Sequence, residues 1–500
     1  MKSLDWKSDR AVPYFVLLVC AVLSVLLYWQ GFTASASIFT VPQSTSFFSN
    51  YLKTTRPFAL VQSILTFVAL GGLYYLGWKA VKKAAGGWAW ALVLGSSLCF
   101  GIVLLFMYPF GASDIFDYIF RGRILGVYGA NPFIQVPRDF SKDLFYCCIA
   151  WKKSPSSYGP LWELLAGETA SLAGGNMLAN LIAFKLLVAG FWAGTLAVAA
   201  LMLRGSSFHN KLSLFYLLAW NPVILYECWG NGHNDIVMIF WVVLAGFAIQ
   251  RKHYTISILA LIAGGMIKYL PLLLLPAAGL VALRNLPGWR QRLRWMLMTG
   301  LLCAGFMFLL FGPFWNGWAT FSVERKAQLY STSIPAVIYQ FVRPDSGNLP
   351  AAGLVSVLAA GITLLYTAVQ STHAWEKPGS EHSGCPCPEW ESFIQISCNI
   401  LLFYLLVTCM WVQQWYMVWV LCLLPFLKPR KRTLLILMGF AFLSKQFIVG
   451  PLIYWQTRWP KQPWLEVCVT LGVMSVPWLL TLFLAKSPEE NLFTHKSEIP

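Results

Sequence analysis

The segment GGWAWALVLGSSLCFGIVLLFMYPFGASDIFDYIFRGR, residues 86–123, joins an uncharged run to a sudden cluster of charges. Residues 86–110 contain no Asp, Glu, Lys or Arg. A helix needs about 20 apolar residues to cross the hydrocarbon core of a bilayer, so this run predicts a membrane span. The charges that follow mark the point where the chain leaves the lipid, and they are Asp114, Asp117, Arg121 and Arg123.

The composition extends this interpretation to the whole chain, with 58% hydrophobic residues, 11% charged residues and a mean hydropathy of +0.61. Soluble domains carry about 25% charged residues. We therefore predict an all-α polytopic transmembrane helical bundle of about 12–14 spans. It would form a single domain over residues 1–485, followed by a polar cytoplasmic tail at 486–500. The spans are expected near 12–30, 57–78, 88–110, 177–203, 211–228, 235–250, 254–268, 270–284, 295–312, 350–372, 393–410, 413–427, 432–449 and 463–485.

The net charge of +17 does not indicate nucleic-acid binding, because the basic residues do not form one patch. They fall in short loops at alternate ends of the spans, which is the positive-inside pattern of cell-membrane proteins. This assignment places both termini and the connector at 373–392 in the cytoplasm. It requires 254–284 to be two short helices broken near Pro271, since proline lacks an amide donor. The loops contain Lys79, Lys82 and Lys83; Arg204 and Lys211; Arg251 and Lys252; Arg284, Arg290, Arg292 and Arg294; and Lys428, Arg430, Lys431 and Arg432.

The same topology places the other polar motifs together on the extracytoplasmic face. Polar groups gathered at one membrane face indicate a site. Residues 111–176 would form an extracytoplasmic catalytic loop with two short amphipathic helices, near 115–125 and 158–172, lying along the membrane surface. The remaining motifs on this face are 227–235, Lys268, 314–318 and 412–416.

The charges after the first long uncharged run suggest a particular chemistry. Asp114, Asp117 and Arg121 can share one helix face, although a solvated surface stripe has the same spacing. A carboxylate can act as general base toward a hydroxyl, while Arg121 and Arg123 can hold a phosphate in forked hydrogen bonds. A membrane-borne phosphate ester would explain a site at the interface. No zinc-ligand spacing, Gly-rich phosphate loop or Gly-x-Ser-x-Gly motif occurs, which argues against a hydrolase and against a nucleotide-driven enzyme. No cofactor is indicated, and a divalent metal is left unassigned.

Two further motifs each allow two interpretations. His233 can orient substrate or assist proton transfer, or it can join Asn234 and Asp235 in an N-cap network for the next span. Lys268 can bind the lipid phosphate, or it can reach the membrane surface from a helix end.

Aromatic and amide residues complete the predicted site. Trp415 and Tyr416 can anchor the chain at the membrane interface or stack on a sugar ring. Gln414 can supply hydrogen bonds to a sugar. Tyr158 and Glu163 belong to the motif at 157–168, where an acid faces either the cleft or the solvated interface.

Five segments resemble the ordered motifs of integral-membrane GT-C glycosyltransferases, in particular bacterial polyprenol-phosphate-mannose-dependent mannosyltransferases. The resemblance covers about residues 88–450. In that family an acidic residue just after a span, in the first large outer loop, is taken as the catalytic base, and Asp114 has this position. The family pattern continues with arginine where this chain has Asp117, so the base is either Asp114 or Asp117. The segments are SDIFDYIFRGRILGVYGANPF, SYGPLWELL, AWNPVILYECWGNGHNDIVMIFWVVLAG, AGGMIKYLPLLLLP and QQWYMVWVLCLLP.

The resemblance implies transfer of a hexose, mannose in that family, from a polyprenyl-phosphate-linked donor to an acceptor hydroxyl on a glycan or glycolipid. Transfer would occur at the extracytoplasmic face with inversion, and the partners would be donor, acceptor and bilayer. A transporter or lipid flippase is the alternative, but it would place ionisable residues near the bilayer middle and show two related halves. A non-enzymatic assembly partner would tolerate loss of Asp114.

Overall fold

A computed structural model describes residues 5–34, 36–40, 57–84, 86–109, 111, 113–206, 210–321, 333–342, 349–375, 388–458 and, singly, Cys468, Gly472 and Ser475. The predicted tail at 486–500 lies outside these residues. So do most of the predicted span at 463–485 and positions 376–387 of the predicted connector.

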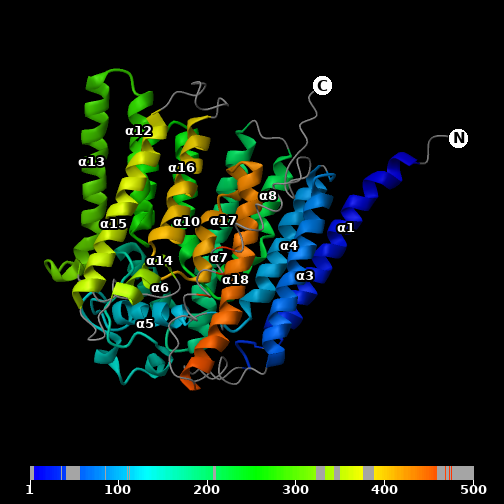
Figure 1. Ribbon diagram of the computed structural model, residues 1–500, viewed down its shortest axis with the longest axis horizontal. Helices are drawn as coiled ribbons and strands as arrows, with labels where there is room; N and C mark the ends of the chain where they lie inside the picture. The colour runs from blue at the N-terminus through cyan, green and yellow to red at the C-terminus, as the bar shows by residue number, and fades with distance from the viewer. Residues whose placement is uncertain are drawn as a thin grey trace.

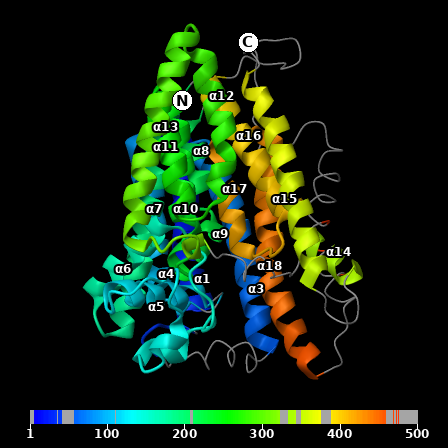
Figure 2. The same ribbon diagram turned by 90° about the vertical axis from the view of Figure 1, so that its left-hand side faces the viewer.

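Seven helices in the described residues are long and apolar enough to cross a membrane. They run alongside one another in Figures 1 and 2. Helices satisfy their own backbone hydrogen bonds, which is why they can span lipid. The prediction of an all-α polytopic bundle is confirmed, and the seven spans are Ala11–Thr33, Val61–Val81, Gly87–Leu105, Met177–Arg204, Trp289–Phe314, Gly353–Trp375 and Glu389–Thr408.

These spans and one further long helix form the frame of the molecule. Each long helix leads the chain from one end of the bundle to the other. The frame consists of α1 (Asp5–Tyr28), α3 (Pro57–Val81), α4 (Gly87–Leu105), α7 (Met177–Arg204), α13 (Trp289–Phe311), α15 (Leu349–Thr372), α16 (Glu389–Phe403) and α18 (Pro429–Arg458).

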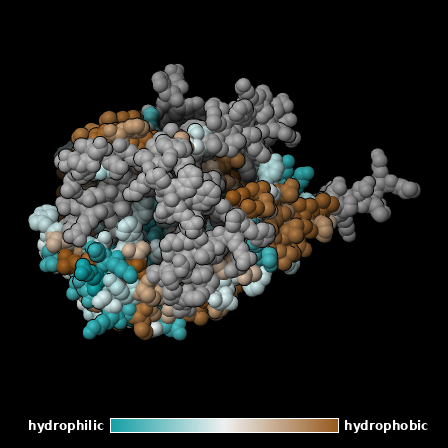
Figure 3. All heavy atoms as spheres, turned by 60° about the horizontal axis from the view of Figure 1, so that its bottom comes forward, coloured by the Kyte–Doolittle hydropathy of each residue, from teal (hydrophilic) through white to brown (hydrophobic). Residues whose placement is uncertain are grey.

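The flanks of the bundle expose large apolar side chains. Phe15 on α1, Leu365 on α15 and Phe308 on α13 are 67%, 68% and 76% exposed. Soluble proteins rarely leave such continuous apolar surface open to water, so these flanks face lipid. Figure 3 shows brown flanks and a gathering of hydrophilic residues over the end of the molecule that holds α5 and its loop.

Two predicted spans are broken into short pieces, which corrects that part of the prediction. Residues 211–228 divide into α8 (Lys211–Ala219), α9 (Pro222–Leu225) and a π-helical turn, η4 (Tyr226–Gly230). Pro222 cannot continue α8, and the Asn221 side chain instead accepts from the backbone N–H groups of Val223 and Ile224. Residues 413–427 likewise divide into η10 (Gln414–Met417), α17 (Val418–Leu421) and η11 (Leu424–Phe426).

The predicted pair of short helices at 254–284 is confirmed. The pair consists of α11 (Tyr254–Gly265), the turn η5 (Leu270–Leu274) and α12 (Leu275–Asn285). Pro271 lies in η5, where the chain turns back. The preceding helix, α10 (Asp235–Gln250), packs against α11 and α7.

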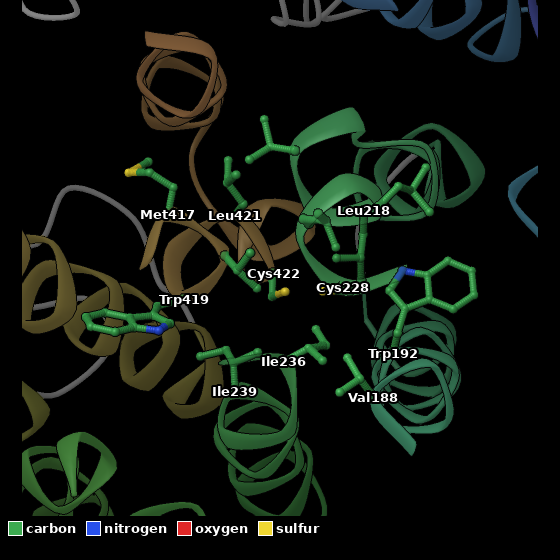
Figure 4. Close-up of a cluster of buried hydrophobic side chains, with 14 of the residues drawn as sticks. Val188, Trp192, Leu218, Cys228, Ile236, Ile239, Met417, Trp419, Leu421 and Cys422 are labelled. Carbon is green, nitrogen blue, oxygen red and sulfur yellow. The ribbon is translucent and has the colours of Figure 1, made fainter. Parts of the chain in front are cut away.

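A dense apolar core lies where these short elements meet the long helices. Figure 4 shows side chains from α7, η4, α10 and α17 pointing toward one another, with Trp192, Cys228, Ile236 and Cys422 among them. All four are at most 4% exposed. Ile236 anchors the beginning of α10 in this core, next to the loop that precedes the helix.

Helices α5 (Asp114–Gly126) and α6 (Pro160–Ala173) lie at one end of the bundle, away from the beginning of α1 (Figures 1 and 2). They approach each other closely, because a Cβ added to Gly122 would lie 2.3 Å from the carbonyl oxygen of Ala166. Residues 115–124 of α5 are all buried. Both helices were predicted, and α5 is covered by other parts of the protein.

The long helices separate the polar end from the basic loops. Lys82 precedes α4 and Asp114 follows it, and α4 has 19 residues. At 1.5 Å per residue, α4 spans about 28 Å. Asp114 and the first basic loop therefore lie at opposite ends of the bundle.

Candidate active site

Asp114 begins α5 and faces the loop before α10. Its Oδ2 lies 3.8 Å from Nδ1 of His233, and its side chain is 15% exposed. The helix N-terminus favours a negative charge there, because the first backbone N–H groups point toward it. Asp114 is therefore an accessible carboxylate beside a buried imidazole.

Asp117, one turn further along α5, has a different environment. Its carboxylate accepts from Nε of Arg121 at 2.8 Å and from Nη2 at 3.3 Å. Both side chains are buried, and Nη2 of Arg121 also donates to the carbonyl of Ser154. The predicted i,i+4 neighbours are thus a buried ion pair rather than a solvated stripe.

Arg123 is likewise engaged within the outer loop. Its Nε and Nη2 both donate to Oδ2 of Asp143, at 3.0 and 2.8 Å. Nη1 donates to the carbonyl of Gly174, and the guanidinium lies over the Phe145 ring. Arg123 therefore ties three loop segments together.

His233 lies at the centre of the polar cluster. Its ring stacks on Trp415, with centroids 4.1 Å apart and planes 15° apart. Its Nε2 lies 3.5 Å from Oε2 of Glu227. Burial, together with the nearby charge of Lys268, holds the pKa of His233 well below its usual value. The imidazole is therefore neutral at neutral pH.

Asn234 and Asp235 do not form the predicted helix cap. No side-chain capping bond occurs at the start of α10. Instead Asn234 Oδ1 accepts from the hydroxyl of Tyr118, and Asp235 Oδ1 accepts from Nε1 of Trp419 at 2.6 Å. The capping interpretation is wrong because tertiary partners on α5 and α17 take these oxygens.

Lys268 pairs with Asp235 at 2.8 Å. Its Nζ also lies 5.8 Å from the ring centroid of Tyr158 and 5.6 Å from that of Tyr416. The side chain is 17% exposed, so the ammonium group is not sealed inside the protein.

Lys268 lines an apolar groove of about 500 Å³. Its other walls come from η5, α15 and the segment 404–419. Its walls are mainly apolar, so it suits a hydrocarbon chain, and Lys268 lies among the residues that line it. The groove is lined by Lys268, Tyr269, Leu270, Leu273, Ala360, Thr363, Leu364, Tyr404, Cys409, Met410, Trp411, Tyr416 and Trp419.

The remaining predicted residues surround this centre. Tyr158 contacts the Tyr118 ring edge-on, and the buried Glu163 accepts from the hydroxyl of Ser156. Trp415 and Gln414 are 5% and 4% exposed, so neither lies on the lipid-facing surface. Tyr416 stacks on Trp419 beside the groove.

Sequence reasoning missed two buried ionisable residues. Glu227 lies within the quoted motif, but its contact with His233 depends on the π-helical turn. Lys185 is a lysine within the predicted span 177–203, and an ionisable residue inside a span was the available signal. Its Nζ donates to the carbonyl oxygens of Leu104, Leu105 and Met107 at the end of α4.

Replacing Lys185 with Met is expected to destabilise the protein. The last carbonyls of a helix have no partner within it, and an unsatisfied buried acceptor costs about 1–3 kcal/mol. We expect Lys185→Met to lower the detergent-solubilised melting temperature and the amount accumulated in membranes. Lys142→Met, at an exposed lysine of the outer loop, is the matched control. Equal melting of both variants would contradict this role.

The fold and the site define a multi-pass helical membrane protein in which a charged cluster adjoins an apolar groove through Lys268. The chain belongs to the family described as Alpha-(1->6)-mannopyranosyltransferase, N-terminal domain, which matches residues 18–284. The resemblance drawn from the motifs is confirmed at this level.

One curated relative is Alpha-(1->6)-mannopyranosyltransferase A of Corynebacterium glutamicum. It is 24% identical over 204 residues, which are 39% of this chain and 40% of the relative. The chain thus aligns with about two fifths of the length of this relative. No solved structure matches the chain.

Proposed function

We propose that this protein transfers mannose from a polyprenyl-phosphate-linked donor to a hydroxyl group of a glycan or glycolipid, forming an α-(1→6) linkage. One observation supports the proposal most directly. Lys268 lines the apolar groove and also pairs with Asp235, beside the cluster of Asp114 and His233. A lipid-linked sugar phosphate needs both environments next to each other. The linkage follows the printed names of the family and the relative.

In this mechanism Asp114 removes the proton from the acceptor hydroxyl. The acceptor oxygen bonds to the sugar carbon from the side opposite the phosphate, so a single displacement inverts that carbon. The bond to the phosphate oxygen breaks, and polyprenyl phosphate leaves with the electron pair. Lys268 stabilises the charge on the leaving phosphate.

Arg121 and Arg123 have no part in this mechanism, because neither lines the groove and their buried guanidinium groups are bonded to Asp117 and Asp143. Asp117 is not the proposed base for the same reason. Among the described residues that line the groove, Lys268 is the cation.

The site is proposed to face the extracytoplasmic side of the cell membrane, with both termini in the cytoplasm. Support comes from the basic loops, which lie at the opposite end of the bundle from Asp114. Cytoplasmic loops carry an excess of Lys and Arg.

The direct test is transfer of radiolabelled mannose from a synthetic polyprenyl-phosphate donor by membranes that contain the protein. We expect a labelled glycan or glycolipid whose new linkage is cleaved by an α-1,6-specific mannosidase. Movement of labelled lipid across the bilayer without formation of a glycosidic bond would instead support the transporter alternative.

Filling the groove is expected to weaken donor binding. Ala360 on α15 lines it, and Ala360→Trp would displace part of the lipid chain. Each buried CH₂ contributes about 0.8 kcal/mol, so losing two raises the KM for a long-chain donor about tenfold. A donor with a short prenyl chain should be affected much less. Leu358→Trp, on the lipid-exposed side of α15, is the control. Equal KM values in both variants would contradict lipid binding in the groove.

A further inference from the structure

Glu227 is a buried acid that the proposed mechanism does not use. It is 0% exposed and lies in η4, between α4 and α7. Its Oε2 accepts from Nδ2 of Asn231 at 2.7 Å and lies 3.5 Å from Nε2 of His233. The other ring nitrogen of His233 faces Asp114, with Nδ1 at 3.8 Å from Oδ2 of that carboxylate. The imidazole of His233 therefore lies between the carboxyl group of Glu227 and the carboxylate of Asp114.

The surroundings of Glu227 favour its neutral acid form. Within the described part of the chain, no Lys or Arg nitrogen lies within 4 Å of its carboxyl group. The nearest charged neighbours on other elements, Asp114 on α5 and Asp235 on α10, oppose a further negative charge. Lys185 on α7 is held by carbonyls of α4, and Lys268 is paired with Asp235. Burying an isolated carboxylate costs much free energy, so the carboxyl group of Glu227 keeps its proton.

We propose that Glu227 is a positioning residue that fixes the tautomer of His233 for Asp114, an inference that rests on the proposed function. As a neutral acid, Glu227 donates its O–H to Nε2 of His233. The single proton of the neutral imidazole then lies on Nδ1 and points toward the Asp114 carboxylate. Such contacts are often long before the substrate is bound and shorten in the reacting complex.

This arrangement has a clear consequence for Asp114. A hydrogen bond from Nδ1 orients one carboxylate oxygen, while the other is left to receive the acceptor proton. Stacking on Trp415 fixes the plane of the imidazole ring. If Glu227 were ionised, it would accept a hydrogen bond from the N–H at Nε2, and Nδ1 would present a lone pair to Asp114. The two negative ends would then repel.

The test compares Glu227→Leu with Glu227→Gln in the mannose-transfer assay. Leu removes the donor, and we expect kcat to fall about 10–100-fold with little change in the KM for the donor. Gln can donate its amide N–H to Nε2 of His233, but it then loses the hydrogen bond from Asn231, which in the wild type reaches the same oxygen, so it should restore part of the lost kcat.

The pH dependence provides a readout that a purely structural role would not change. The acid form of Glu227 is the active one, so wild-type transfer should fall as the pH rises and Glu227 ionises. Glu227→Gln has no proton to lose and should lack this alkaline decline. Because this variant is nearly isosteric, the comparison holds even where Glu227→Leu does not accumulate.

The outcomes separate this inference from the proposed function. Wild-type membranes that form no labelled product would overturn the proposed function. If wild type is active and Asp114→Asn is inactive, the positioning role of Glu227 is overturned by either of two results. One is wild-type kcat in Glu227→Leu, and the other is an unchanged alkaline decline in Glu227→Gln.

Discussion

Membranes carrying Asp114→Asn are expected to transfer about a thousandth of the mannose transferred by wild-type membranes. Asn has nearly the shape of Asp, but its amide cannot accept the acceptor proton, and general base catalysis contributes about 10²–10⁴-fold. The measurement is initial incorporation of radiolabelled mannose from the synthetic donor, normalised to the protein in the membrane. The loss should appear in kcat rather than in the KM for the donor.

Asp139→Asn is the matched control for this variant. Asp139 is an exposed carboxylate in the same outer loop, and its side chain accepts from the backbone N–H of Val136. It should transfer mannose at the wild-type rate. Undiminished turnover by Asp114→Asn would rule out Asp114 as the base.

Arg121→Met is expected to destabilise the protein by about 3–5 kcal/mol, because it leaves the buried Asp117 carboxylate without its cation. We expect little protein in the membrane and a lower melting temperature after solubilisation. The double variant Arg121→Met/Asp117→Leu should recover part of this loss, since it removes the stranded charge as well.

Arg138→Met, an exposed arginine in the same loop, should melt like wild type. The experiment also distinguishes the structural role of Arg121 from phosphate binding. If Arg121→Met accumulates and melts normally but shows a raised KM for the donor, the ion pair is not structural and the arginine contacts the donor phosphate.

Local sequence patterns predicted the helices well where a long apolar run decides the outcome. The spans at 88–110 and 177–203 correspond to α4 and α7, and the turn at Pro271 was also foreseen. The break within 211–228 was not predicted. The hydropathy of this segment resembles that of a continuous membrane helix, but Asn221 and Pro222 interrupt its backbone. An average hydropathy over the segment does not register such a break, although proline lacks the amide donor that a continuous helix needs.

The residues of the candidate site illustrate a different limit. Spacing placed Asp114, Asp117 and Arg121 on one helix, and it could not say that Asp117 pairs with Arg121 while Asp114 faces His233. Glu227 and Lys185 gain their partners from other elements, so no local pattern identifies those contacts.

The sequence by itself determined that the chain is a multi-pass helical bundle whose polar motifs gather at one end. Hydropathy and charge alone decide which segments enter lipid, so the order of residues suffices for that conclusion. Only the tertiary structure decided which ionisable groups are paired with each other and which border the groove. Partners such as Asp235 and Lys268 are distant in sequence, and their pairing depends on how α10 and α11 pack.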